Sequence, residues 1–293
     1  MYFVSQYRFV LLFIFCIAAS AVIRQYLMFS ISPLLVLWVS SILASLYFHT
    51  VIFKKIPSLY QKISQSPLDF LLHNILISIV WVCTFYSIYF SSASLYTYVY
   101  FITGAVFSIG FQKNKTTVNK IIALILLFLT LLPFVLYPNY FIGIALGILS
   151  GGVAFFYNML SEKIAKSHKL KTSELLASRF WLLIIIPMFL IAPSEVTQLS
   201  PDAAKIILLS TILSMIMQTW ASQKSILSIG ARETSGAISF ASAVTFLVQG
   251  IFLDSWSPYI LILSLLSAAF VGFNLMKNYQ STSILMLKKK SPA

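Results

Sequence analysis

The chain has 293 residues, of which 59% are hydrophobic and only 9% are charged. Soluble domains carry about a quarter charged residues, so this composition excludes a water-soluble fold and predicts a chain dissolved in a bilayer. The formal net charge of +13 does not indicate a nucleic-acid partner, because the basic residues lie between apolar segments and form no patch with aromatic residues.

Ten apolar segments are each long enough, at about 20 residues, to cross the hydrocarbon core as a helix. In chain order they are 9–28, 33–53, 68–90, 92–111, 118–137, 141–160, 175–191, 204–222, 235–253 and 258–276. The connectors are short and leave no room for a soluble domain. The first segment resembles a secretory signal near residues 18–21, but its apolar stretch continues beyond them, so we expect an uncleaved first span.

Basic residues orient these spans. If the N-terminus is cytoplasmic, all of the 20 Lys and Arg residues except Arg24 and Lys205 fall in inside segments. Cytoplasmic connectors are rich in basic residues, so this alternation favours ten spans with both termini in the cytoplasm. The sequence therefore predicts a multi-pass protein of the cell inner (plasma) membrane, in contact with the lipid bilayer.

The ten spans divide into two groups of opposite orientation. Span five ends outside and span six begins there, as in the inverted repeats of secondary transporters. We predict an all-α fold with ten transmembrane helices in two inverted five-helix repeats. The predicted limits are 1–138 and 139–280 for the repeats and 281–293 for a basic cytoplasmic tail. A shift of 138 residues places Ser87-Ile88 on Ser225-Ile226, which is a weak internal similarity.

Polar side chains inside spans are costly in lipid and usually face the protein interior. Several of them share one helical face in spans three, four, eight and nine. Helix packing explains many single Ser and Thr residues, whereas amides such as Gln218 need several partners and favour a lined pathway. The candidate substrate-binding residues are Arg24, Asn74, Trp81, Tyr96, Tyr100, Asn158, Gln218, Ser239 and Ser242.

Arg24 lies toward the outer end of span one, with no acidic residue near it in the sequence. Two interpretations stay open: its guanidinium extends to the outer interface, or it faces a cavity and meets an anionic group. Arg179, near the cytoplasmic end of span seven, has the two corresponding interpretations: it extends to the interface nearby, or it faces a cavity. In span six, Gly143, Gly147 and Gly151 form a small-residue stripe that predicts close packing of two helices.

The sequence contains no constellation typical of catalysis. Its three His residues are scattered, both Cys residues lie in apolar runs, and no carboxylate lies in the middle of a span. There is no metal-ligand spacing and no Gly-rich phosphate loop, and no Ser has a base partner. We therefore expect no enzymatic activity, no metal and no cofactor. Because proton-coupled carriers usually bury an acid or His on their path, facilitated diffusion or exchange stays open beside proton coupling.

Ten short-loop helices in two halves resemble the drug/metabolite transporter superfamily, in particular its EamA-like branch. The motifs that carry the resemblance are the break at Ser91-Ser92-Ala93-Ser94 before span four, its counterpart at 230–235, Pro33 and Arg179. The departures are the absence of proline at 97–101 and 238–242, Leu253-Asp254 for the usual Gly-Glu, and Ser40-Ser41 for an expected arginine. The chain thus resembles a divergent member.

The resemblance implies a central cavity lined by spans one to four and six to nine, with spans five and ten at the periphery. It implies a secondary transporter of small organic metabolites that works by alternating access, with export as the expected direction. An amino acid or a related solute is the favoured substrate. Two other cargoes stay open: a lipid-linked sugar, moved by a flippase, and an organic cation or nucleoside-type metabolite such as S-adenosylmethionine. A non-transporting membrane scaffold is the alternative of another class.

Overall fold

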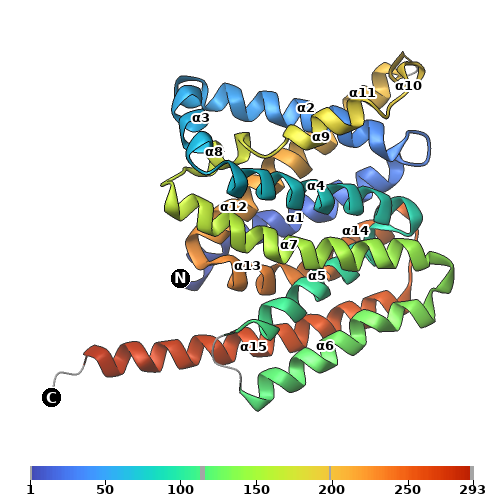
Figure 1. The fold of residues 1–293 in the computed structure, drawn as a ribbon. Coiled ribbons are helices and arrows are strands. Elements are labelled where there is room, and N and C mark those ends of the chain that lie inside the picture. The colour runs from blue at the N-terminus through green and yellow to red at the C-terminus, as the bar shows by residue number, and fades with distance from the viewer. Residues whose placement is uncertain (1, 113–115, 198, 291–293) are drawn as a thin grey trace.

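The structure is a computed structural model that describes the backbone of residues 2–112, 116–197 and 199–290. Side chains are described from residue 7 to residue 274 within these ranges. Every regular element in this part of the chain is a helix, and the longer helices lie side by side in one bundle (Figure 1). Lys113, Lys115 and the side chains of the predicted tail, 281–293, lie outside the described residues.

Eight helical segments in the described part of the chain are long and apolar enough to cross a membrane. They are Tyr7–Leu27, Pro33–Val51, Pro67–Phe90, Ala93–Gly110, Thr117–Leu136, Pro138–Ser167, Pro201–Ile229 and Ala231–Leu253. Each overlaps one of the predicted spans. The protein is therefore an all-α, multi-pass membrane protein.

The corresponding single helices are α1 (Tyr2–Leu27), α2 (Pro33–Val51), α4 (Pro67–Phe90), α5 (Ala93–Gly110), α6 (Thr117–Leu136) and, after the short η2 (Pro138–Tyr140), α7 (Phe141–Ser167). The last two segments are composite: α11 (Pro201–Thr211), η3 (Ile212–Gln218) and α12 (Thr219–Ile229); and α13 (Ala231–Ala237), η4 (Ile238–Phe240) and α14 (Ala241–Leu253).

Local sequence explains where several helices begin. Proline occupies the first turn of α2, α4 and α11, where its missing N–H costs no hydrogen bond. Hydroxyl side chains cap three described N-termini, those of α5, α6 and α11. Ser92 Oγ accepts from the Leu95 N–H, Thr116 Oγ1 from the Asn119 N–H, and Ser200 Oγ from the Ala203 N–H.

Two predicted spans take a different form. Residues 175–191 are divided into α8 (Thr172–Ala177) and α9 (Trp181–Met188), and the apolar stretch of α15 (Pro258–Lys290) is the shorter Pro258–Asn274. In Figure 1, α8 lies toward one end of the bundle, α10 (Pro193–Thr197) lies toward the other, and α9 lies between them. This segment thus runs along the bundle in pieces, and the structure shows eight candidate spans rather than ten.

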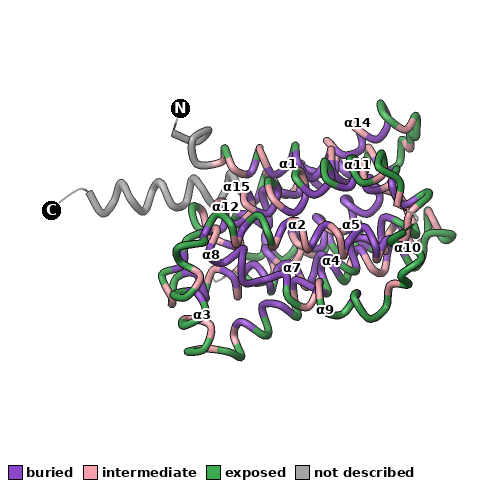
Figure 2. Tube along the Cα trace, turned by 90° about the horizontal axis from the view of Figure 1, so that it is seen from above, coloured by how far each residue is buried: buried purple, intermediate pink, exposed green. Residues whose placement is uncertain are grey.

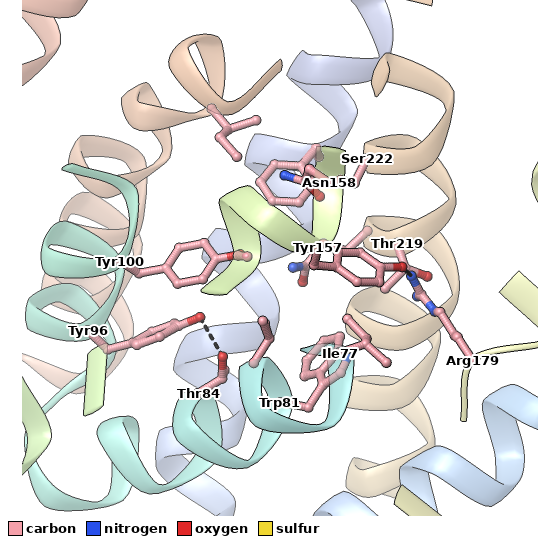
Figure 3. A pocket seen from close by; sticks show the side chains of 15 residues that line it. Ile77, Trp81, Thr84, Tyr96, Tyr100, Tyr157, Asn158, Arg179, Thr219 and Ser222 are labelled. Carbon is pink, nitrogen blue, oxygen red and sulfur yellow. Dashed lines mark hydrogen bonds between the residues drawn. The ribbon is translucent and has the colours of Figure 1, made fainter. Parts of the chain in front are cut away.

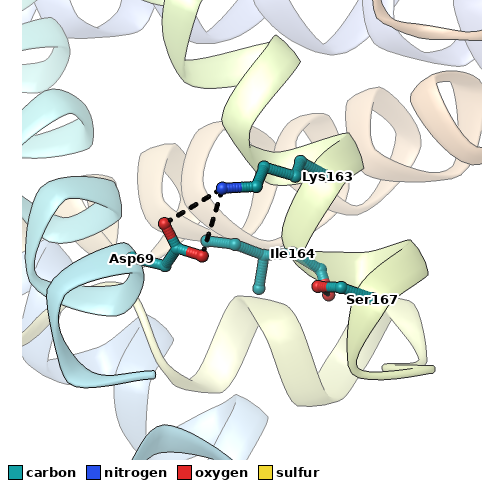
Figure 4. A network of polar contacts seen from close by, with 4 residues as sticks. All are labelled: Asp69, Lys163, Ile164 and Ser167. Atoms are coloured by element: carbon teal, nitrogen blue, oxygen red, sulfur yellow. Dashed lines mark hydrogen bonds and ion pairs between the residues drawn. The ribbon is translucent and has the colours of Figure 1, made fainter. Parts of the chain in front are cut away.

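A short helix missed in the sequence occupies the connector before α4. After the single turn η1 (Phe53–Lys55), α3 (Ile56–Gln65) buries Leu59 and exposes most of its other residues. Two ion pairs join elements at its end of the bundle. Lys55 Nζ lies 3.1 Å from Glu174 on α8, and Lys163 Nζ on α7 lies 3.3 Å from Asp69 on α4 (Figure 4).

The bundle is closely packed where α7 crosses α4 and α5. The predicted glycine stripe lies in this contact: Gly143 faces Ser91, Gly147 faces Val99, and Gly151 faces the backbone of Tyr100. On the other side, α1 packs against α12 and α14. The predicted halves therefore interlock rather than forming separate bodies.

Buried residues gather on the inward sides of the helices (Figure 2). Large apolar side chains cover the outside instead, with Phe15, Leu124 and Val135 among the most exposed. Contact of such a surface with lipid is favourable, and its contact with water is unfavourable. The polar groups described next lie inside it.

Candidate functional site

A pocket lies between α1, α4, α5, α7 and α12, and the segment between α8 and α9 also borders it (Figure 3). Its lining combines aromatic, amide and hydroxyl side chains with one arginine. The lining residues are Phe13, Ile77, Val80, Trp81, Thr84, Tyr96, Tyr100, Ala154, Tyr157, Asn158, Arg179, Gln218, Thr219, Ser222 and Ile238. None of these described residues comes from α6 or α15.

The space open to a water molecule inside the pocket is about 50 Å³. This is room for a few waters. A molecule of amino-acid size fits this space only if the lining helices or side chains move apart.

Aromatic and hydroxyl groups from three helices form one wall. Tyr96 Oη on α5 lies 2.9 Å from Thr84 Oγ1 on α4, which lies 3.1 Å from Ser150 Oγ on α7. The rings of Tyr96 and Tyr100 lie 5.4 Å apart between centroids. This wall offers flat apolar faces together with hydroxyl groups that can exchange hydrogen-bond partners.

Arg179 lies in the interruption between α8 and α9. Asn74 on α4 stabilises this interruption, because its Nδ2 donates to the Ser178 carbonyl oxygen at 2.8 Å. Within α9, Trp38 Nε1 donates to the Ile184 carbonyl oxygen at 3.0 Å. Buried backbone groups outside a helix need partners such as Asn74 supplies.

The Arg179 side chain is only 2% exposed and is incompletely paired. Its Nη1 donates to Tyr157 Oη at 2.9 Å, whereas Nε and Nη2 have no partner. Tyr157 is held in turn by stacking on the His73 ring, with 4.8 Å between centroids. Both ring nitrogens of His73 are buried without a partner. This corner of the pocket thus carries a positive charge and several unsatisfied polar groups.

Arg24 is fully buried beside the pocket. Its Nε donates to the Ser20 carbonyl oxygen at 3.1 Å and its Nη2 to Ser20 Oγ at 3.4 Å, while Nη1 has no partner. Its guanidinium carbon lies 5.6 Å from the centroid of Trp81 and 5.3 Å from that of Phe85. These contacts offset part of the cost of burying the charge. Arg24 therefore faces the interior, and the alternative of an extension to the outer interface is wrong.

Gln218 ends a π-helical turn, η3, inside the α11–α12 segment. Such turns are rare and often occur at functional sites, because the widened turn moves a side chain out of α-helical register. Gln218 Oε1 accepts from Ser20 Oγ at 3.4 Å, and Ser20 also bonds Arg24. A polar connection thus runs from the buried guanidinium of Arg24 to the pocket.

No acidic side chain lines the pocket among the described residues. The described ion pairs join lysines to carboxylates elsewhere, and none of them includes Arg24 or Arg179. The site therefore carries two buried cations without a protein counter-ion, which is a costly arrangement in a low dielectric.

Hydrogen bonds join neighbouring helices toward both ends of the bundle. At one end, the Ala93 N–H donates to Gln25 Oε1 and the Ser94 N–H donates to Gln249 Oε1, each at 2.7 Å. At the other end, α7 bonds α12 and α13. The pairs are Ser161 with Gln223 at 2.8 Å, Asn158 with Ser235 at 3.3 Å, and the Ala231 N–H with Glu162 Oε2 at 2.8 Å.

Five of the candidate residues predicted from sequence come together in the pocket: Trp81, Tyr96, Tyr100, Asn158 and Gln218. Two others act beside it, since Arg24 lies behind Trp81 and Asn74 holds the break next to Arg179. Ser239 and Ser242 do not line it. Their hydroxyls donate to carbonyl oxygens of their own helix, Gly236 and Ser239.

The sequence analysis missed Tyr157, Thr84 and Ser20. In α4 the lining residues are Ile77, Val80, Trp81 and Thr84. They form a face that is rotated by about one residue from the polar face that Asn74 and Trp81 suggested. Tyr157 directly precedes Asn158, but adjacent residues of a helix do not face each other, so this gave no signal. Ser20 lies one helical turn before Arg24, which is a local signal, whereas its bond to Gln218 joins residues far apart in the sequence.

Among the described residues, no group of three His, Cys, Asp or Glu side chains is placed to hold a metal ion. No family model matches the chain, and no curated protein matches it either.

Proposed function

We propose that this protein is a secondary transporter that moves small organic metabolites across a membrane by alternating access, with one central binding site. The observation that carries the proposal is the pocket itself. Polar and aromatic side chains from widely separated helices converge on it inside a lipid-facing bundle, and its lining spans both predicted halves. Polar groups in such a position are costly and typically serve a solute path.

Interrupted helices at the site support the same function. Transporters typically build their midplane sites from discontinuous helices. Here Arg179 lies in the break between α8 and α9, and Gln218 lies at the end of the π-helical turn η3. The small pocket and the close glycine contact of α7 with α5 are compatible with helices that rock against each other during transport.

We further propose ten crossings in two inverted halves, 1–138 and 139–280. In this arrangement residues 175–191 and α15 supply the two crossings beyond the eight candidate spans. The distribution of basic residues favours cytoplasmic termini in the inner (plasma) membrane. The EamA-like resemblance, which rests on sequence motifs alone, favours the same architecture and outward transport. We ascribe no catalysis and no cofactor to the chain.

The rival functions predict different results. A lipid-linked sugar flippase moves a lipid between leaflets and shows no uptake of soluble solutes. A membrane scaffold moves nothing and keeps a partner protein through purification.

Purified protein in liposomes, tested against a broad metabolite panel, separates these cases. We expect concentrative or exchange flux of at least one soluble metabolite. We also expect that flux to be lost in Gln218→Ala and Tyr96→Ala and to remain in Lys205→Ala, which alters an exposed residue of α11. Absence of any soluble flux, with scrambling of a labelled lipid in the same liposomes, would establish the flippase instead.

A further inference from the structure

We infer that the solute carries an anionic group, a carboxylate or a phosphate, and that Arg179 is the residue that binds it. This inference rests on the proposed function and names the substrate class of the same pocket. It starts from the unpaired positive charge at the site. Arg24 and Arg179 are 0% and 2% exposed, both have N–H groups without a partner, and no carboxylate lines the pocket among the described residues.

The two arginines differ in which N–H groups are free. In Arg24, Ser20 occupies both Nε and Nη2, so only Nη1 is left. In Arg179, Tyr157 occupies only Nη1, and the free groups are Nε and Nη2. These two nitrogens form one edge of the planar guanidinium, with parallel N–H bonds that match the two oxygens of a carboxylate or phosphate.

The surroundings fix Arg179 in this orientation. Tyr157 holds the opposite side of the guanidinium and is itself stacked on His73. The guanidinium carbon also lies 4.9 Å from the centroid of Phe180. A side chain held in this way loses little further conformational freedom when an anion binds, which favours affinity. Arg24 supplies a second positive charge behind Trp81, without a free two-nitrogen edge of its own.

The pocket also disfavours the other charge classes. A cation would face two buried arginines without a carboxylate to offset them, which is a repulsive arrangement in a low dielectric. A neutral solute would leave the guanidinium edge of Arg179 unpaired. The wall formed by Trp81, Tyr96 and Tyr100 offers ring faces for the uncharged remainder of the solute. A soluble organic anion with a planar or apolar part therefore fits best.

Binding to the purified protein tests this directly by thermal shift, since a ligand that binds the folded state raises its unfolding temperature. The panel contains anionic, zwitterionic, cationic and neutral metabolites. It includes 3-phenylpropionate, phenylalanine, phenethylamine and 3-phenylpropanol, which share a ring and a short chain but differ in charge. Phosphatidylcholine vesicles that contain phosphatidic acid present the same anionic chemistry on a lipid, and vesicles without phosphatidic acid are their control.

We expect the stabilising solutes to carry a carboxylate or phosphate. In Arg179→Lys, which keeps the charge but loses the two-nitrogen edge, the Kd of the best anion should rise roughly tenfold. In Arg179→Gln it should rise roughly a hundredfold. In Lys205→Gln, an exposed lysine paired with Asp202, the Kd should not change.

Stabilisation by cationic or neutral solutes alone would overturn the inference and leave the proposed carrier standing. Stabilisation by phosphatidic acid without any soluble anion would overturn the soluble substrate class. If no solute of any class shifts the wild-type protein or crosses the liposome membrane, the proposed function itself fails. The wild-type charge series needs no variant, so it decides the substrate class even if Arg179→Gln does not fold. The role of Arg179 then rests on Arg179→Lys, and an unchanged Kd of the best anion in that variant would overturn it.

Discussion

Replacing Gly151 by alanine tests the contact between α7 and α5 that positions the pocket wall. A Cβ atom at this position would lie 2.2 Å from the Tyr100 carbonyl oxygen and 3.0 Å from Thr103 Cβ. Ordinary van der Waals contact begins near 3.4 Å, so the two helices must separate by about 1.2 Å. The clashing oxygen belongs to the backbone, and it cannot turn away as the end of a flexible side chain could.

The expected cost follows from two opposing effects. Overpacking of a tight interior typically costs about 1–3 kcal/mol, while alanine is better than glycine inside a helix by about 1 kcal/mol. Because the clash is with backbone, we expect the upper end of this range and a net loss of about 2 kcal/mol. By the scale of soluble domains of 150–250 residues, that is a drop in unfolding temperature of roughly 4–8 °C.

Gly104→Ala is the matched control. Gly104 lies on α5 in the same contact, but a Cβ there meets only the Gly151 carbonyl oxygen at 4.0 Å. It gains helix propensity without a clash, so we expect an unchanged or higher unfolding temperature. Thermal unfolding of both variants in detergent, followed by tryptophan fluorescence, gives the comparison. If Gly151→Ala unfolds at or above the temperature of Gly104→Ala, the proposed close contact is wrong.

Three further predictions concern polar groups and charge. Thr84→Val leaves the Tyr96 hydroxyl without its Thr84 partner, whereas Ser150 Oγ still donates to the Val80 carbonyl oxygen. The change should cost about 1–3 kcal/mol in unfolding experiments, and adding Tyr96→Phe should recover part of that loss. Burial raises the pKa of Glu174, but the Lys171 backbone N–H and the Lys55 ammonium outweigh it and hold the pKa below its ordinary value of 4.5. The stabilisation is therefore complete above the unfolded-state pKa and lost as pH falls through the folded-state one, so the unfolding temperature of Glu174→Gln should fall less on acidification. If the solute is an anion moved alone, an inside-negative potential of 100 mV should drive it outward to a gradient of roughly 50-fold in liposomes, and no response to a valinomycin-set potential would contradict uncoupled anion export.

Hydropathy predicted the long helices well. In lipid, any apolar segment of sufficient length must satisfy its own backbone hydrogen bonds, and it does so as a helix. The break at 178–180 was not predictable, since it contains neither Gly nor Pro and depends on Asn74 from α4. α3 was missed because a short amphipathic helix looks like a polar connector in a hydropathy profile.

The candidate site was predictable in part. Tyr96, Tyr100 and Gln218 were found because long polar side chains in a span have few other places to go. Ser239 and Ser242 do not line the pocket, because a hydroxyl in a helix can bond a carbonyl one turn earlier and needs no cavity. The sequence left two interpretations of the Arg24 orientation, and only the packing of Trp81 and Phe85 around the guanidinium decides between them.

The hydrogen bonds at the two ends of the bundle determine how easily its helices separate there. Gln25 and Gln249 hold the start of α5 at one end, and Asn158 and Ser161 bond the facing helices at the other. Except for the bond to the Glu162 carboxylate, these hydrogen bonds join neutral groups. Replacing each of them by a bond to water has a net cost of about 0.5–1.5 kcal/mol. The ion pair of Lys163 with Asp69 also joins α7 to α4 at this second end, but it is exposed and contributes little. Under the proposed alternating access, either end can therefore open at a small cost in free energy, because each described ion pair has at least one exposed partner.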